Sequence, residues 1–270
     1  MKFKNYIYLI LFMTTLIFTI PVESKTVLIT GSNRGIGLEF TNQYAQMGWN
    51  VIASSRTPED DEELIKLSRE FENISIEKLD VTNHKQIDDL AKKLKDIPID
   101  VLLNNAGILG GDEKVQQIGN LDFESMENVY KTNTIAPLKM AEAFLNNVLS
   151  SDEKKIIVIT SGTASITNVP DVSGVKKISK YYKPLYLYRM SKTAINMGYK
   201  NLAMELAPQG VHVGIMAPGI VETRLLQQAG YSGMGMSTKD SVTNVIRNIN
   251  NLDPETSGKY ILFNGKTLPW

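Results

Sequence analysis

Tyr188 and Lys192 are the pair of residues with the clearest capacity for chemistry, because they stand four positions apart in Tyr188-Arg189-Met190-Ser191-Lys192. On a helix this spacing puts the phenol and the ammonium group on the same face. A free phenol has a pKa of about 10, and a nearby cation favours the phenolate and lowers that pKa toward the working pH. The pair could therefore donate or accept a proton. The same spacing occurs by chance in many helices, so it needs support from the rest of the chain.

Ser161 and Asn133 are two further candidates for the same site. Ser161 directly follows the expected strand 155–160 at its carboxyl end, and ligands of open parallel sheets bind at the carboxyl ends of strands. A serine at such a place is otherwise an ordinary turn residue. Asn133 lies in the expected helix 121–149, where a lone asparagine is usually solvated or bonded to the backbone. Neither residue indicates a function by itself.

The glycine-rich stretch 31–37 predicts a phosphate-binding loop. The apolar run Val27–Ile29 before it is typical of a strand buried on both faces, and a helical pattern opens at Leu38. Such a strand, loop and helix cradle a phosphate, because the glycine backbone permits close approach and the helix end presents free N–H groups. We predict a dinucleotide site. Its loop residues are Gly31, Ser32, Asn33, Arg34, Gly35, Ile36 and Gly37.

Strand and helix patterns alternate along the whole chain after residue 24, which indicates a parallel sheet with helices on both faces. We predict an α/β fold with a single Rossmann-type, doubly wound parallel sheet of about seven strands. The pattern contains no linker or repeat, so residues 25–270 are expected to form one domain. The expected strands after the first are 50–54, 74–79, 100–103, 155–160, 211–216 and 260–263.

The order of the motifs resembles that of the short-chain dehydrogenase/reductase family, and the resemblance covers residues 25–270. The motifs are the spacing Thr-Gly-x-x-x-Gly-x-Gly from Thr30, the turn Asn104-Asn105-Ala106-Gly107, the strand-end Ser161, the Tyr188 and Lys192 pair, and Pro218-Gly219 with the following Thr223. The ending 264–270 resembles the carbonyl-reductase-like branch, which includes the sniffer and C-factor proteins. Membership would imply an NAD(P)-binding Rossmann fold and a homo-oligomer.

The resemblance implies a role for each member of a catalytic set of four. Tyr188 would be the acid/base, Ser161 would hydrogen-bond the carbonyl oxygen, and Lys192 would also hold the nicotinamide ribose. Asn133 would hold a water that links Lys192 to solvent, although Ala136 replaces the glycine of the family's segment. The implied activity is hydride transfer between a nicotinamide cofactor and a small-molecule carbonyl or alcohol. The alternative is a non-catalytic NADP-binding redox regulator of the same fold, which would need no proton donor.

The resemblance also implies further contacts with the cofactor. Asp80 would meet the adenine amino group, and NADP(H) is expected to be preferred over NAD. The strand end Ser54-Ser55-Arg56 contains no acid for a ribose hydroxyl, and Arg56 and Arg34 could clamp a 2′-phosphate. They could instead be two solvated surface arginines. The remaining expected contacts are Val81, Asn105, Ala106, Gly107, Tyr188, Lys192, Pro218, Gly219, Val221 and Thr223.

Composition and charge exclude several other classes. Lysine and arginine together number 29, as do aspartate and glutamate, so no basic surface indicates nucleic acid. The chain has no cysteine, which removes disulfides and cysteine-ligated metals. His84 and His212 lack the spacing of a metal site, and we expect no metal.

Residues 1–24 predict a leader. Two lysines precede the apolar run 6–20, Pro21 ends it, and Ser24 suits a cleavage site. A secretory signal peptide and an uncleaved membrane anchor are both open, so membrane association through 6–20 is possible. We expect the protein in the secretory pathway or at a membrane, and in the cytoplasm if the leader is not functional.

Residues 168–184 separate Ser161 and Tyr188 more widely than in most members of the family. This insertion is rich in lysine and tyrosine. It is expected to be a surface loop beside the mouth of the site, and it could instead bind an acidic partner or a membrane face.

Overall fold

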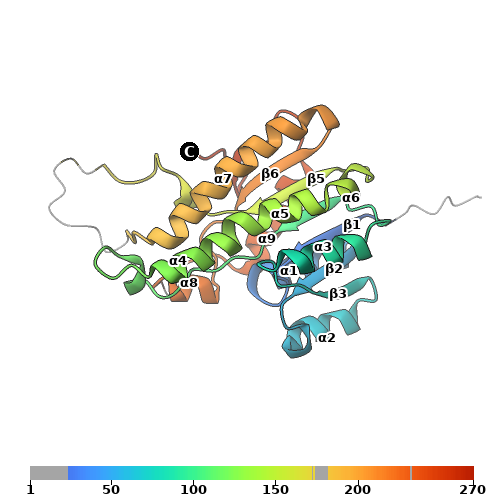
Figure 1. The fold of residues 1–270 in the computed structure, drawn as a ribbon, viewed down its shortest axis with the longest axis horizontal. Helices are drawn as coiled ribbons and strands as arrows, with labels where there is room; N and C mark the ends of the chain where they lie inside the picture. The colour runs from blue at the N-terminus through green and yellow to red at the C-terminus, as the bar shows by residue number, and fades with distance from the viewer. Residues whose placement is uncertain (1–23, 172, 174–181, 232) are drawn as a thin grey trace, which may run out of the picture.

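The computed structural model describes residues 24–171, 173, 182–231 and 233–270 (Figure 1). The predicted leader lies outside the described residues except for Ser24, and so does most of the insertion. Within the described ranges, no helix combines the length and the apolar character needed to cross a membrane.

A single sheet of seven parallel strands forms the centre of the molecule, in the order β3-β2-β1-β4-β5-β6-β7. The predicted fold class is therefore confirmed. The strands begin and end within one residue of most of the predicted ranges. They are β1 (Thr26–Thr30), β2 (Asn50–Ser55), β3 (Ile74–Lys78), β4 (Val101–Asn104), β5 (Lys155–Ile159), β6 (His212–Ala217) and β7 (Tyr260–Leu262).

Helices cover both faces of this sheet (Figure 1). They are α1 (Gly35–Gln46), α2 (Glu62–Glu70), α3 (His84–Lys93), α4 (Phe123–Tyr130), α5 (Ala136–Ala143), α6 (Leu145–Leu149), α7 (Tyr186–Leu206), α8 (Arg224–Gln228) and α9 (Thr238–Asn250). Short 3₁₀ turns lie at Pro58–Asp60, Lys114–Gln116, Gly162–Ala164 and Ala207–Gln209.

Two apolar cores lie on the two faces of the sheet. Residues of α3, α5 and α7 pack on one face with Leu28, and residues of α1, α2 and α9 pack on the other with Val27 and Ile29. Successive side chains of a strand point to opposite faces, so the continuous apolar run of β1 serves both cores. Three buried strand residues in succession, Val27, Leu28 and Ile29, have no exposed surface.

The expected long helix 121–149 is divided in the structure. A π turn, Lys131–Ile135, separates α4 from α5, and Phe144 has non-helical dihedrals (φ −101°, ψ 9°) between α5 and α6. Pro137 explains the first break, because proline has no N–H to donate to the carbonyl of Asn133 and its ring crowds that carbonyl. The π turn places Asn133 fully inside the protein. Such turns are frequent at functional sites.

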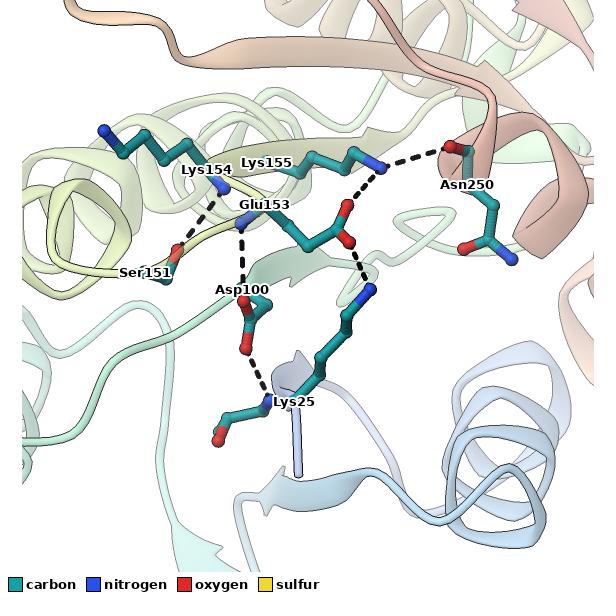
Figure 2. Close-up of polar contacts among 8 residues, drawn as sticks. Lys25, Asp100, Ser151, Glu153, Lys154, Lys155 and Asn250 are labelled. Atoms are coloured by element: carbon teal, nitrogen blue, oxygen red, sulfur yellow. Dashed lines mark hydrogen bonds and ion pairs between the residues drawn. The ribbon is translucent and has the colours of Figure 1, made fainter. Parts of the chain in front are cut away.

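A polar network joins the amino ends of β1, β4 and β5 (Figure 2). The Glu153 carboxylate pairs with the ammonium groups of Lys25 and Lys155, the latter at 2.7 Å, and Asp100 accepts the backbone N–H of Thr26 at 2.8 Å. Burial raises the pKa of Glu153, but the hydrogen bonds from the two lysines outweigh it and leave that pKa lowered. This network ties the three strands together at their amino ends, which is the end of the sheet opposite the carboxyl ends.

The strand order reverses between β1 and β4, so the segments that leave these two strands diverge. In open α/β sheets, ligands bind outside the carboxyl ends at such a point. The glycine loop follows β1, and the Asn104–Gly107 turn follows β4. The fold thus brings two of the predicted motifs to one place.

Candidate active site

The glycine loop requires its glycines for two different reasons. Gly31 and Gly35 have φ of 70° and 55°, which side-chain-bearing residues rarely adopt. Gly37 has ordinary dihedrals but no room, because an added Cβ would stand 2.0 Å from the Gly31 carbonyl oxygen and 2.5 Å from Asn105 Nδ2. The close approach of loop and helix that a dinucleotide site needs is therefore built into the chain.

Helix α1 begins without a capping side chain. Arg34 at its N-cap is extended and makes no capping hydrogen bond, and the first turn has no acidic residue. By contrast, side chains of Asn83, Asp122, Thr223 and Ser237 cap α3, α4, α8 and α9. The first N–H groups of a helix attract anions when nothing else binds them. The start of α1 therefore fits the pyrophosphate of a dinucleotide.

The turn after β4 braces the glycine loop. The Asn105 side-chain amide donates to the carbonyl oxygens of Thr30 and Gly31 at 2.9 and 3.1 Å. In return the Thr30 hydroxyl accepts the backbone N–H groups of Asn105 and Ala106, both at 3.1 Å. Residues predicted as cofactor contacts on two separate segments thus form one rigid unit.

The segment after β6 lies across from the glycine loop. A Cβ added to Gly35 would stand 3.7 Å from Thr223 Cγ2, which is ordinary van der Waals contact. The Pro218 carbonyl accepts the Ser241 hydroxyl at 2.7 Å, and Val221 bridges to Met236. These contacts hold the predicted nicotinamide-side segment, which includes Gly219, next to the loop.

Tyr188, Ser161 and Lys192 lie together at the carboxyl end of β5. The Ser161 hydroxyl is hydrogen-bonded to the Thr163 hydroxyl at 2.9 Å and accepts the Thr163 N–H at 3.2 Å, and it lies near enough to the Tyr188 phenol to act on the pKa of that group. Both Tyr188 and Lys192 are on α7, as their spacing predicts, and the ammonium nitrogen lies 5.9 Å from the centre of the phenol ring. The same nitrogen donates to the Ile159 carbonyl at 2.8 Å. The serine, the phenol and the ammonium group therefore share one site.

Asn133 reaches the same site from the π turn. Its amide bonds both backbone groups of Ile108 at 2.9 Å, and its Nδ2 donates to the Ser191 hydroxyl at 3.0 Å. A Cβ added to Gly107 would stand 3.3 Å from Lys192 Nζ and 3.4 Å from Asn133 Oδ1. Because Gly107 has no side chain, the space between Lys192 Nζ and Asn133 Oδ1 is not filled by a Cβ, as a water between these two groups would require.

Burial dominates the protonation of the two central groups. It raises the pKa of Tyr188 to about 12, against a lowering effect of the neighbouring Ser161 hydroxyl, and it lowers the pKa of Lys192 to about 8. The prediction from the sequence that Lys192 lowers the pKa of Tyr188 is wrong for the protein without its cofactor, because the pKa of Tyr188 is raised there. The ammonium faces the ring and the Ile159 carbonyl, while both groups lose their hydration. Tyr188 is consequently a neutral phenol over the ordinary pH range.

The burial of Lys192 should make the free energy of unfolding depend on pH. Below pH 8 Lys192 is charged in the folded and unfolded chain, and the cost of burying the charge is complete. Between pH 8 and 10.5 the unfolded chain retains the proton that the folded chain has lost, so stability rises with pH relative to a chain without this lysine. Without cofactor, the unfolding free energy of wild type should therefore rise between pH 8 and 10.5 by up to about 3 kcal/mol relative to that of Lys192→Met. Urea denaturation at several pH values measures it, and a constant difference would contradict the burial effect.

Two supporting residues carry no motif. The Tyr260 hydroxyl donates to the Ser161 carbonyl oxygen, and fully buried Gln116 accepts the Tyr188 backbone N–H at 3.1 Å while donating to the Leu109 carbonyl at 2.9 Å. Both contacts join segments far apart in sequence. No signal in the chain marks these residues in advance.

The mouth of the site is apolar with one ion pair at its rim. Leu109, Leu185 and Ala229 form a buried cluster, against which Tyr188, Leu225 and Tyr231 pack. Glu113 pairs with Lys183, at the described end of the insertion. Lys183 is the insertion residue that makes this contact among those described, and the position of the rest of the insertion beside the site stays a prediction.

The adenosine side departs from expectation at one place. Asp80 follows β3, and its Oδ1 accepts the N–H and hydroxyl of Thr82 at 2.9 and 2.7 Å, while the neighbouring Val81 is buried. The expectation that no acid lies at the end of β2 is wrong, because the Asp61 carboxylate folds back onto Ser55, the last residue of that strand. Sequence position alone hides this contact, which crosses the intervening 3₁₀ turn.

The two expected phosphate-binding arginines are solvent-exposed. Within the part of the chain that the structure describes, Arg34 and Arg56 make no side-chain hydrogen bond or ion pair. Over the same residues, no group of three or more His, Cys, Asp or Glu side chains could hold a metal ion.

The fold and this arrangement define a dinucleotide-binding oxidoreductase. The family model for short chain dehydrogenases matches residues 25–231, and the chain belongs to the short-chain dehydrogenase/reductase family. A similar protein, the 1-hydroxy-2-glutathionyl-2-methyl-3-butene dehydrogenase of Rhodococcus sp. (strain AD45), is 30% identical over 249 residues, covering 91% of this chain and 100% of the relative. C-signal of Myxococcus xanthus is 30% identical over 173 residues, covering 64% of this chain and 93% of C-signal.

Solved structures show the same likeness. The NADPH-bound carbonyl reductase from chicken fatty liver has a TM-score of 0.79 and 30% identity, over 92% of this chain and 99% of that one. The carbonyl reductase Sniffer of D. melanogaster has a TM-score of 0.77 and 27% identity, over 92% of this chain and 100% of that one. These likenesses confirm the resemblance to the carbonyl-reductase-like branch.

Proposed function

We propose that this chain is an NADPH-dependent reductase of small carbonyl compounds that can also oxidise the corresponding alcohols. One observation carries the proposal: Ser161, the half-buried Tyr188 phenol and the buried Lys192 ammonium group lie together at the carboxyl end of β5, at the end of the sheet where a glycine loop meets a helix without a capping side chain. A phenol so placed can protonate an oxygen that gains charge. The bound NADP(H) of structural neighbours supports the cofactor assignment.

The cofactor, when bound, supplies the hydride that reduces the carbonyl carbon. Ser161 holds the carbonyl oxygen by a hydrogen bond, and Tyr188 donates its proton to that oxygen as negative charge develops. Lys192 holds the ribose hydroxyls, and its positive charge stabilises the phenolate that remains. A water at Asn133, next to the space left by Gly107, returns a proton through Lys192. Each role uses a residue already fixed by the contacts described above.

The rival function is a non-catalytic NADP-binding regulator of the same fold. A panel of aliphatic, aromatic and quinone carbonyls with NADPH, followed by absorbance at 340 nm, separates the two. Steady NADPH oxidation with formation of one alcohol per NADPH supports the reductase. Tight NADPH binding without oxidation across the panel would favour the regulator.

The localisation proposal rests on the leader. We propose that residues 1–24 direct the protein into the secretory pathway as a signal peptide or hold it at a membrane as an anchor. Residue 24 lies at the amino end of β1, so a leader joins the domain at the sheet edge opposite the candidate site. A tether there would leave the site accessible. The first residue of the protein isolated from its native host distinguishes the two leaders.

The preference for NADPH is proposed to come from Arg56 and Arg34. A charge-assisted contact with a 2′-phosphate is worth about 1.5–3 kcal/mol, so one clamp gives tenfold or better discrimination. Arg56→Asp should reverse much of this preference, because it replaces attraction by repulsion. The measurement is kcat/KM with NADPH and with NADH in both proteins.

Arg69→Asp is the matched control, because it reverses the charge of another exposed arginine, in the last turn of α2. Its cofactor ratio should stay near that of wild type. A wild type that prefers NADH, or an unchanged ratio in Arg56→Asp, would leave both arginines as solvated surface residues.

A further inference from the structure

The carboxylate of Asp61 is held by both of its oxygens beside the glycine loop. Oδ1 accepts Asn33 Nδ2 at 3.1 Å, and Oδ2 accepts the hydroxyl of Ser55. Asn33 belongs to the loop after β1, and Ser55 is the last residue of β2. Asp61 is therefore tied to the two elements between which a Rossmann fold binds the adenosine ribose.

The neighbouring acids are not held in this way. Glu59 pairs with Lys78 at 2.7 Å, on the exposed surface, and the Asp60 side chain is exposed. Asp61 is half-buried. Among the described residues of this turn, it is the one acid whose side chain hydrogen-bonds the glycine loop. The carboxylate is thus placed by specific contacts and is not merely one charge of an acidic turn.

A carboxylate in this position discriminates between the two dinucleotides. It is an acceptor with about four lone-pair sites, of which Asn33 and Ser55 use two, so it can still accept a ribose hydroxyl. NAD(H) has a free 2′-hydroxyl to donate. The 2′-phosphate of NADP(H) has no such donor and carries negative charge, which a fixed carboxylate repels.

We propose that Asp61 is a cofactor-selecting residue that favours NAD(H) and opposes the two arginines, so that the chain's preference for NADPH is a small difference between two opposing effects. The inference rests on the proposed function, since it concerns the same cofactor site. Arg34 and Arg56 attract the 2′-phosphate without contacting Asp61 in the described structure, while Asp61 disfavours it. Selectivity built from attraction and repulsion together is common in specific sites.

Removal of this charge should raise the preference for NADPH. In Asp61→Asn we expect the Kd for NADPH to fall about tenfold and the Kd for NADH to rise about threefold, as repulsion and a charged acceptor are both lost. Isothermal titration calorimetry on the full chain measures both constants without turnover. Asp61→Ser, which keeps a small hydrogen-bonding group at the start of α2, is measured in parallel so that the result does not depend on one substitution folding.

Asp60→Asn is the matched control, because it removes the same charge from the adjacent position without touching Asn33 or Ser55. Its ratio of the two constants should change less than about twofold. The inference is overturned if Asp61→Asn and Asp61→Ser leave the ratio within twofold of wild type, or if Asp60→Asn shifts it equally. The wild-type ratio tests the proposed NADPH preference separately, since a wild type that prefers NADH contradicts that preference while a shift in Asp61→Asn still supports the role of Asp61.

Discussion

Replacement of Tyr188 by phenylalanine is expected to lower kcat for carbonyl reduction by at least about a hundredfold, the usual contribution of a positioned general acid. The Kd for NADPH should remain within about twofold, because the ring and its packing are retained. The reason is that the Tyr188 phenol is the proton donor that lies beside both Ser161 and Lys192 at the described site. Steady-state kinetics and calorimetric titration of NADPH give the two quantities.

Tyr186→Phe is the control for this result. Tyr186 is an exposed residue two positions earlier on α7, so its hydroxyl should not affect turnover. If Tyr188→Phe keeps more than about a tenth of wild-type kcat, a loss of about 1.4 kcal/mol or less, another group is the acid.

Lys192→Ala should damage cofactor binding and turnover together. The ammonium group is buried beside the phenol, and the proposed mechanism gives it both the ribose hydroxyls and the proton relay. Loss of a charge-assisted hydrogen bond should raise the Kd for NADPH at least about tenfold. Loss of the relay should lower kcat by about a hundredfold or more. The melting temperature is measured alongside, because the truncation also removes the packing of a buried side chain and its hydrogen bond to the Ile159 carbonyl, and lost stability must be separated from lost binding.

Lys200→Ala provides the comparison, since this lysine is exposed two turns further along the same helix. Both of its constants should match wild type. A Lys192→Ala protein that binds NADPH normally but turns over slowly would remove the ribose role and leave the relay. Normal values for both constants would contradict the assignment of Lys192 altogether.

Most of the fold could be predicted because it depends on local patterns. Most strands are short apolar runs, and helices follow all strands but the last, which leaves few arrangements other than a parallel sheet covered on both sides. The glycine loop could be predicted for the same reason, since Gly31, Gly35 and Gly37 meet steric requirements within seven residues. The Tyr188 and Lys192 pair depends only on the period of one helix.

Features that depend on tertiary contacts could not be predicted. In the sequence, Asp61 is one of the consecutive acids 59–63, and only the folded chain brings it to Ser55 and Asn33. The pKa of Tyr188 depends on burial by residues from several segments, and spacing carries no information on burial. Pro137 was visible in the sequence, but its effect on the turn at Asn133 required the helix geometry.

The most direct test of the proposed function is isotopic. Wild type and Tyr188→Phe are supplied with NADPH that carries deuterium at both positions of the nicotinamide C4. The carbonyl compound is the one that the panel shows to be reduced fastest, or the whole panel if none is reduced. Mass spectrometry then locates the deuterium in the product. We expect wild type to place one deuterium on the carbinol carbon of the alcohol and Tyr188→Phe to form at least about a hundredfold less of that product. Binding of NADPH by wild type with no transfer of deuterium to any carbonyl would contradict the reductase.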